Sequence, residues 1–236
     1  MGRAYEVRKA SIQKTGAARG KIYSMYAREI YEVAKNGGTE LESNLALKRL
    51  VDKAKKEQVP NDIIKRAIDK VNSGADESYS SVRYELFGPS GSNVIVDCLT
   101  DNVNRSVSLI RAALNKTSAK MGAMGSVAFM YDNLCVVSFK GMTEDETLEA
   151  LIEAEVDADI EVQEENIVLY GKPADLYAIK EAILAKKQVE FDVDEIKMIP
   201  KDRVVLEGET LEDFEKLLNL LDEIEDVNHV YHNVEL

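Results

Sequence analysis

One ordered run of predicted elements constrains the fold of this chain more than any other feature. From residue 134 onward, short apolar stretches with alternating strand and helix periodicity predict strand, helix, strand, strand, helix and strand. Their ranges, in that order, are 134–139, 144–153, 159–163, 166–170, 173–185 and 190–198. This β-α-β-β-α-β order is that of the ferredoxin-like arrangement. We therefore predict a ferredoxin-like α+β domain over residues 134–201.

The segments on either side predict a second α+β domain, into which the first one is inserted. Two strands, 82–87 and 93–99, are joined by the turn Gly88-Pro89-Ser90-Gly91. A helix over 106–114 and a strand over 127–131 are predicted next. After Pro200, a strand over 203–206, a helix over 211–221 and a strand over 227–234 are predicted to complete the sheet begun at residue 82. Asp132-Asn133 is predicted to join the strands 127–131 and 134–139, and residues 120–126 to form a mobile surface loop. The split domain is thus predicted over residues 82–133 and 202–236.

Three short amphipathic helices are predicted before residue 75, followed by a polar linker over 73–81. Gly16 and Gly20 predict a turn before the first helix, which starts at Lys21 and ends at Asn36-Gly37-Gly38. The second helix is predicted to start at Ser43 or Asn44 and to end before Pro60. Asn61 is predicted to cap the third helix, which ends at Gly74. Helices this short bury their apolar stripes only against one another. We therefore predict a three-helix bundle over residues 1–75, and an α+β fold class for the whole chain.

Charge is segregated along the chain in the same three steps. Residues 1–72 carry 16 Lys/Arg and 9 Asp/Glu, residues 73–141 carry 6 of each, and residues 143–236 carry 8 and 28. The chain as a whole has a net charge of −13, yet residues 1–28 alone have a net charge of +6. A basic segment in an acidic chain indicates a polyanionic partner, although a solvated basic arm without a partner is the alternative.

The sequence offers no constellation for catalysis or metal binding. Cys98 and Cys135 are widely spaced without a CxxC, and His229 and His232, three apart on a predicted strand, point to opposite faces. The alternating carboxylates at 157, 159 and 161 lack the glycine and glutamate positions of an EF-hand. We expect no metal, no cofactor, no small-molecule substrate and no enzymatic activity.

No apolar run approaches the ~20 residues that cross a bilayer. The N-terminus has no apolar stretch typical of a secretory signal. With only two cysteines, a reducing compartment fits the composition. We expect a cytoplasmic protein without a membrane partner.

The basic first module supplies the candidate nucleic-acid contacts. Tyr26 lies on the apolar stripe of its helix and is expected in the core, whereas Tyr5 lies among the charges and can stack on bases. The predicted nucleic-acid-binding residues of this module are Arg3, Tyr5, Arg8, Lys9, Lys14, Arg19, Lys21, Lys55 and Lys56.

Three blocks of the sequence resemble the YebC/PmpR family. They are RGKIYSMYAREI (19–30), RYELFGPSGSNVIVDCLTDNVNR (83–105) and GSVAFMYD (125–132), and the likeness covers essentially the whole chain. The family pattern opens with a tryptophan motif, where this chain has Gly2-Arg3-Ala4-Tyr5 and no Trp, which makes it more similar to the paralogous YeeN-like branch. The resemblance implies three domains, the last inserted into the middle one.

The resemblance also implies a function. Family members are described as transcriptional regulators that bind promoter DNA, and some, with mitochondrial relatives that activate synthesis of a cytochrome oxidase subunit, as acting on the ribosome. Both roles use a polyanion. Because the resemblance includes TDNVNR and a helix start can meet phosphate, Asn102, Asn104 and Arg105 are added as candidate contacts, with capping and interdomain hydrogen bonds as an equal alternative.

Three functional hypotheses follow from these observations. The chain is a DNA-binding transcriptional regulator, a ribosome- or RNA-bound translation factor, or an adaptor whose acidic domains bind a basic protein.

Overall fold

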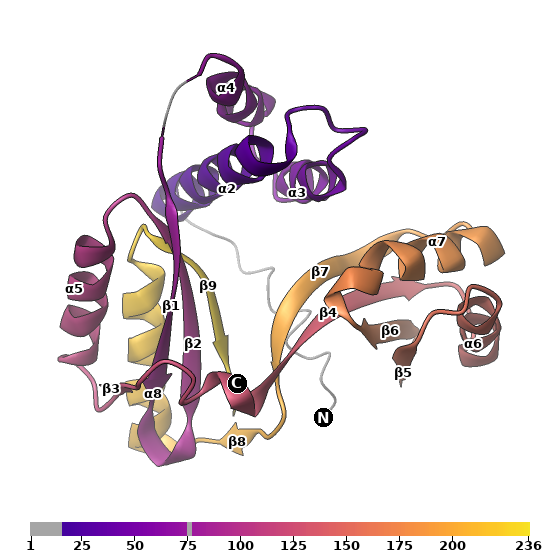
Figure 1. Cartoon of the computed structure of the whole chain (residues 1–236). Coiled ribbons are helices and arrows are strands. Elements are labelled where there is room, and N and C mark those ends of the chain that lie inside the picture. The colour runs from indigo at the N-terminus through magenta and orange to yellow at the C-terminus, as the bar shows by residue number, and fades with distance from the viewer. Residues whose placement is uncertain (1–15, 75–76) are drawn as a thin grey trace. The chain divides into compact units, whose positions relative to one another are not determined.

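The computed structural model describes residues 16–74 and 77–236, with side chains from Arg19 onward. The described residues form two compact units, one over 129–202 and the other over 16–74, 77–128 and 203–236. Both units contain sheets, and the larger one begins with helices (Figure 1). The predicted α+β fold class, with an N-terminal helical region followed by sheet domains, is confirmed. The three-domain boundaries given above stay a prediction.

The N-terminal helices are α2 (Gly16–Gly37), α3 (Leu45–Lys56) and α4 (Asn61–Asn72). Their apolar stripes pack into one buried cluster that includes Tyr26, Ile30, Leu47 and Ile64. Tyr26 is therefore a core residue, as expected. The predicted turn between Gly16 and Gly20 is wrong, because α2 begins at Gly16 and continues through Gly20. A glycine inside a helix costs only about 1 kcal/mol relative to alanine, which the packed stripe of a 22-residue helix offsets.

The caps of α3 and α4 differ from each other. Of the two predicted start residues, Ser43 and Asn44, it is Asn44 that caps α3, since its side chain accepts a hydrogen bond of 3.0 Å from the Leu47 amide. The cap predicted at Asn61 is wrong: Pro60 occupies the N-cap position of α4, and Asn61 is the first helical residue. The fixed φ of proline and its carbonyl, which accepts from Ile63 and Ile64, start this helix without a side-chain cap.

A four-stranded sheet in the order β3-β1-β2-β9 forms the centre of the larger unit. Helices α5 and α8 pack on one face of this sheet, where their apolar residues share a core with Leu86, Val96 and Val227 (Figure 1). The elements are β1 (Ser80–Phe87), η1 (Pro89–Gly91), β2 (Asn93–Thr100), α5 (Val103–Leu114), β3 (Lys120–Met121), α8 (Gly208–Asp222) and β9 (Val227–His232). The strand predicted to complete the sheet from the C-terminal region is thus present as β9.

Three predictions in this unit are wrong. The strand predicted over 203–206 does not join the sheet, because β8 (Val204–Val205) pairs instead with β10 (Val234–Glu235). The loop predicted over 120–126 is wrong at its start, where β3 pairs with β1, whereas residues 122–126 do form a surface loop in which Met124 is 94% exposed. The Gly122 amide in this loop donates to the Glu85 carbonyl. Residues 127–131 do not form a separate strand: Ala128–Met130 is a short 3-10 helix (η2).

The smaller unit has the predicted strand and helix order. Its sheet has the order β5-β6-β4-β7, and α6 and α7 cover one face with a core that includes Val137, Phe139, Leu151 and Ile179. The elements are β4 (Tyr131–Lys140), α6 (Glu144–Glu153), β5 (Ala158–Gln163), β6 (Asn166–Gly171), η3 (Pro173–Asp175), α7 (Leu176–Lys186) and β7 (Phe191–Pro200). The turn predicted at Asp132-Asn133 is wrong, because both residues pair with β7 within one continuous strand.

Candidate nucleic-acid interface

The predicted contact residues fall on three helices and on the segment before them. Arg3, Tyr5, Arg8, Lys9 and Lys14 lie outside the described residues. The others are Arg19 and Lys21 in the first turns of α2, Lys55 and Lys56 in the last turn of α3, and Asn102, Asn104 and Arg105 at the start of α5.

Helix α2 directs two of its cations at the last residue of α8 and at the turn that follows it. The Lys21 Nζ donates to the Asp222 carbonyl at 2.5 Å and lies 3.4 Å from its carboxylate. The Arg28 Nη2 donates to the Glu225 carbonyl at 2.5 Å. Both cationic side chains are largely buried, at 19% and 12% exposed. Lys21, predicted as a nucleic-acid contact, is thus placed in a contact within the protein.

A third contact of α2 lies beside these two. The Glu29 carboxylate accepts from the Asn228 side chain at 2.6 Å and lies 3.2 Å from His229 Nε2. Burial acts to raise the Glu29 pKa, but the hydrogen bonds from His229 and Asn228 outweigh it and hold that pKa below its ordinary value. Together with Lys21 and Arg28, this carboxylate joins α2 to the α8–β9 segment.

Besides Arg19 and Lys35 on α2, the exposed cations of the described bundle lie on α3 and α4. Lys55 and Lys56 are exposed, while Leu47, Val51 and Ala54 on the same helix are buried. On α4, the cations are largely balanced by their own neighbours: Arg66 lies 2.5 Å from Asp62, and Lys70 lies 2.8 Å from Glu77. The C-terminal turn of α3 contains three basic residues, Lys53, Lys55 and Lys56. Cations also stabilise the negative end of a helix, so this turn has a structural role as well.

The start of α5 is built from hydrogen bonds inside the protein. Asn102 caps the helix by accepting from the Arg105 amide at 3.0 Å. Asn104 is exposed, and its carbonyl accepts from the Ser108 hydroxyl at 2.7 Å. The capping role that sequence analysis left open for this motif is therefore present at Asn102.

Arg105 forms a bidentate pair with the buried Asp226. Its Nη2 and Nε lie 2.6 Å and 3.0 Å from the two carboxylate oxygens, and Nη2 also lies 2.7 Å from Asp101. Hydrogen bonds to Asp226 and Asp101 raise the Arg105 pKa. Asp226 is 2% exposed and also accepts from the Ser106 hydroxyl at 2.8 Å. This arginine ties α5 to the α8–β9 turn, the segment that α2 contacts from the bundle.

A second buried carboxylate, at Glu85, was not among the predicted site residues. Glu85, in the middle of β1, is 4% exposed, and its carboxylate accepts from the amides of Gly125, Val127 and Ala128 at 2.6, 2.5 and 2.8 Å. Burial acts to raise the Glu85 pKa, but these three hydrogen bonds lower it below the ordinary value. The available signal was weak: Glu85 lies between Tyr84 and Leu86, but the same strand also contains the charged Arg83, and the sequence does not name the partner.

The histidines and carboxylates do not assemble a metal site in the described parts of the chain. His229 contacts Glu29, whereas His232 packs edge-on against the core residue Phe214 with ring centroids 5.4 Å apart. Within residues 16–74 and 77–236, no group of three His, Cys, Asp or Glu side chains is arranged to hold a metal ion. No helix in these ranges is long and apolar enough to span a membrane.

Comparison with known proteins gives matches along the whole chain. Residues 3–74 match the family described as TACO1/YebC protein N-terminal domain, and residues 79–234 match TACO1/YebC second and third domain. A protein of Marinobacter nauticus is 47% identical over 100% of this chain and 99% of its own length. One of Vibrio cholerae is 46% identical over 100% of both chains. Both are named as a "probable transcriptional regulatory protein".

A solved structure supports the same assignment. The crystal structure of a conserved hypothetical protein from Aquifex aeolicus has a TM-score of 0.79 and 33% sequence identity, covering 96% of this chain and 94% of that one. Two family matches that together span residues 3–234, and relatives of nearly equal length, agree with the arrangement of helices and sheets described above. The chain therefore belongs to the TACO1/YebC family.

Proposed function

We propose that this chain is a non-enzymatic regulator of gene expression that binds nucleic acid through its basic N-terminal module. The observation that carries the proposal is the C-terminal turn of α3, where Lys55 and Lys56 are exposed on a module with a net charge of +7 in an acidic chain. The names of the relatives support a regulatory role.

Physical chemistry favours phosphate as the group recognised. Duplex nucleic acid carries one negative charge per ~1.7 Å of its axis, and each phosphate that a cation neutralises releases counterions. Exposed lysines on one helical turn meet this requirement, and Arg19 at the start of α2 is exposed as well. The acidic unit over residues 129–202 is repelled by the same polyanion, which orients the protein on its target.

Two targets fit this chemistry. The names of the relatives support promoter DNA and transcription. The composition of α3 supports a second candidate, a translation factor bound to ribosomal RNA. This helix has no Asn, Gln, Ser or Thr between Leu45 and Lys56, so its cationic side chains suit backbone contacts better than adenine recognition. Backbone contacts serve shape recognition of folded RNA.

The domain arrangement, the location and the partners belong to the same proposal. We place a basic helical domain at 1–75, a split α+β domain at 82–133 and 202–236, and an inserted ferredoxin-like domain at 134–201. The protein works in the cytoplasm, with promoter DNA or the ribosome as its partner and without a cofactor, metal or small-molecule substrate.

Sedimentation separates the two targets. Cell lysate is run through a sucrose gradient at low and moderate salt, with and without ribonuclease, and the fractions are probed for this protein. Co-sedimentation with ribosomal particles that salt or ribonuclease abolishes supports the translation factor. Protein at the top of the gradient, together with a large ratio of specific to random DNA affinity at physiological salt, supports the transcriptional regulator. If the protein neither sediments with ribosomal particles nor binds DNA with a large specific-to-random affinity ratio, the proposed function is wrong.

A further inference from the structure

The smaller unit has an unpaired strand at one edge of its sheet. Strand β5 is the last strand of the order β5-β6-β4-β7, and within the described residues it pairs with β6 alone. An edge strand presents a row of backbone donors and acceptors that another extended segment can join.

The two faces of β5 differ in chemistry. Ile160 and Val162 pair with Leu169 and Ile167, which belong to the core under the helices, so these two side chains lie on the helix-covered face. Asp159 and Glu161 lie on the opposite face. Val162 is 48% exposed. The edge is thus apolar on one face and acidic on the other.

Helix α6 extends the apolar face beyond the sheet. Leu148 and Ile152, one turn apart, are 48% and 66% exposed. The neighbouring residues Glu149 and Glu153 form ion pairs with Lys186 of α7, whose Nζ lies 3.1 Å and 3.3 Å from their carboxylate oxygens. Since successive helical residues are rotated by about 100°, Leu148 and Ile152 lie on the flank of α6 turned away from α7, the side on which α6 contacts β5.

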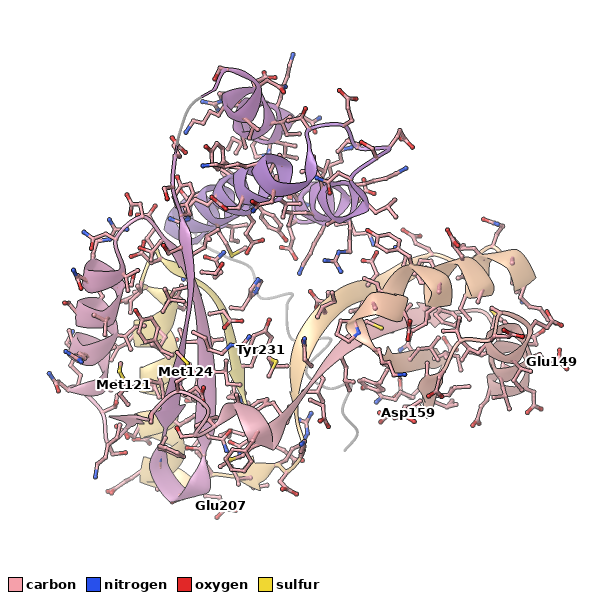
Figure 2. The ribbon with its side chains drawn as sticks, in the orientation of Figure 1. Met121, Met124, Glu149, Asp159, Glu207 and Tyr231 are labelled. Atoms are coloured by element: carbon pink, nitrogen blue, oxygen red, sulfur yellow. The ribbon has the colours of Figure 1, made fainter. Side chains whose placement is uncertain are left out.

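From this arrangement we propose that β5 is a docking edge for an extended segment of a basic protein, in which apolar residues alternate with Lys or Arg. The segment adds to the sheet as a fifth strand. Its apolar side chains meet Val162, Leu148 and Ile152, and its cations meet Asp159 and Glu161 on the other face. Figure 2 shows Asp159 on β5 and Glu149 on α6 pointing outward from this unit.

The negative charge of the smaller unit favours a basic partner for β5. Residues 129–202 contain 19 acidic and 7 basic residues, a net charge of −12. A second copy of β5 would place like carboxylates opposite one another, which destabilises a strand pair, whereas a basic strand places opposite charges there. The acidic residues thus protect the edge against self-association while admitting a basic partner.

The other edge of the same sheet lacks this combination. On β7, Asp194 is paired with Lys180 and Glu195 with Lys197, and Asp192 is an exposed carboxylate with no exposed large apolar residue beside it on that strand. Of the described large apolar side chains that are exposed, none lies on β7, whereas Val162 lies on β5. The β7 edge therefore serves as an internal control.

The test uses the full-length chain and a ten-residue peptide of alternating valine and lysine. Binding is measured by titration, and its location by slowed amide hydrogen exchange in β5. The double variant Asp159→Lys/Glu161→Lys is compared with Glu190→Lys/Asp192→Lys, which makes the same charge change at the β7 edge. The unfolding transition of each variant shows that it is folded.

We expect the β5 variant to bind the valine–lysine peptide about tenfold more weakly than the wild type does. The same variant should bind a peptide of alternating valine and glutamate instead. The β7 variant is expected to keep the wild-type preference for the valine–lysine peptide. Ile152→Lys is expected to weaken binding of that peptide, although it leaves Asp159 and Glu161 unchanged. Equal loss in the β5 and β7 variants would show attraction by net charge alone and overturn the proposal. The proposal is also overturned if the peptide does not bind, if it binds without slowing amide exchange in β5, or if the chain forms dimers joined through β5.

Discussion

The pair formed by Arg105 and Asp226 gives the sharpest prediction about stability. Replacing Asp226 by Asn keeps the shape of a 2% exposed side chain but removes the charge that accepts from Arg105 at 2.6 and 3.0 Å. Removing one partner of a fully buried ion pair costs about 3–5 kcal/mol. Here the Arg105 side chain is 45% exposed and can be rehydrated, so we expect a loss of about 2–3 kcal/mol in the free energy of unfolding.

Asp101→Asn is the matched control. It removes a carboxylate 2.7 Å from the same arginine, but one that is 61% exposed, and such surface pairs contribute about 0.2–1 kcal/mol. Urea unfolding monitored by circular dichroism compares the two variants, and only Asp226→Asn is expected to lower the midpoint markedly. Equal midpoints would refute the structural role. A gain in nucleic-acid affinity without destabilisation would show instead that Arg105 serves mainly as a phosphate contact.

Two further predictions concern the buried Glu85 and the half-buried Glu29. Glu85→Gln replaces one acceptor oxygen by a donor facing the amide of Gly125 or Val127, so it should lower the free energy of unfolding by about 2–3 kcal/mol. The Glu85 pKa is lowered in the fold, so the ionised carboxylate stabilises the folded protein fully above the unfolded pKa of about 4.3. This stabilisation is lost as the pH falls through the folded pKa. Glu85→Gln should therefore show a weaker pH dependence of its urea midpoint from about pH 6 to about pH 3 than the wild type. A parallel acid dependence in wild type and variant would contradict this. Glu29→Gln should speed hydrogen exchange in β9 around Asn228 while leaving β6 unchanged, and identical exchange rates in β9 would show that the contact with α2 contributes nothing.

The ferredoxin-like element order could be predicted because its signals are local. The predicted helix over 144–153 has the bounds of α6, and its strands are short runs whose apolar residues face one core. The helix-capping signal at Asn44 was equally local. Segments whose neighbours in sequence are also their neighbours in structure can be assigned from periodicity and capping residues alone.

The errors arise where distant residues decide the structure. Val127 and Ala128 read as part of a strand, but their amides are taken by Glu85, about forty residues earlier. Asp132 and Asn133 read as a turn, but pairing with β7 keeps them in a strand. Turn propensity is weak compared with a complete ladder of sheet hydrogen bonds.

The same limit applies to the candidate interface. A count of charges cannot distinguish Lys21, which meets Asp222 from 201 positions away, from Lys55, which is exposed. Nor could the sequence decide whether Arg105 met phosphate or protein, because Asp226 lies 121 positions along the chain. Charge segregation located the module, and the structure was needed to see which cations already contact the protein.

The central claim is that exposed cations of the first module bind the phosphate backbone. The most direct measurement is the dependence of the dissociation constant on salt, for duplex DNA and for structured RNA, in the wild type and in Arg19→Gln/Lys55→Gln/Lys56→Gln. The slope of log Kobs against log salt should fall by about 0.9 for each duplex phosphate that the variant no longer neutralises, whatever the base sequence. Lys140→Gln/Lys172→Gln/Lys216→Gln, with the same charge change outside the bundle, should keep the wild-type slope. An unchanged slope in the first variant, or an equal fall in both, would contradict the account.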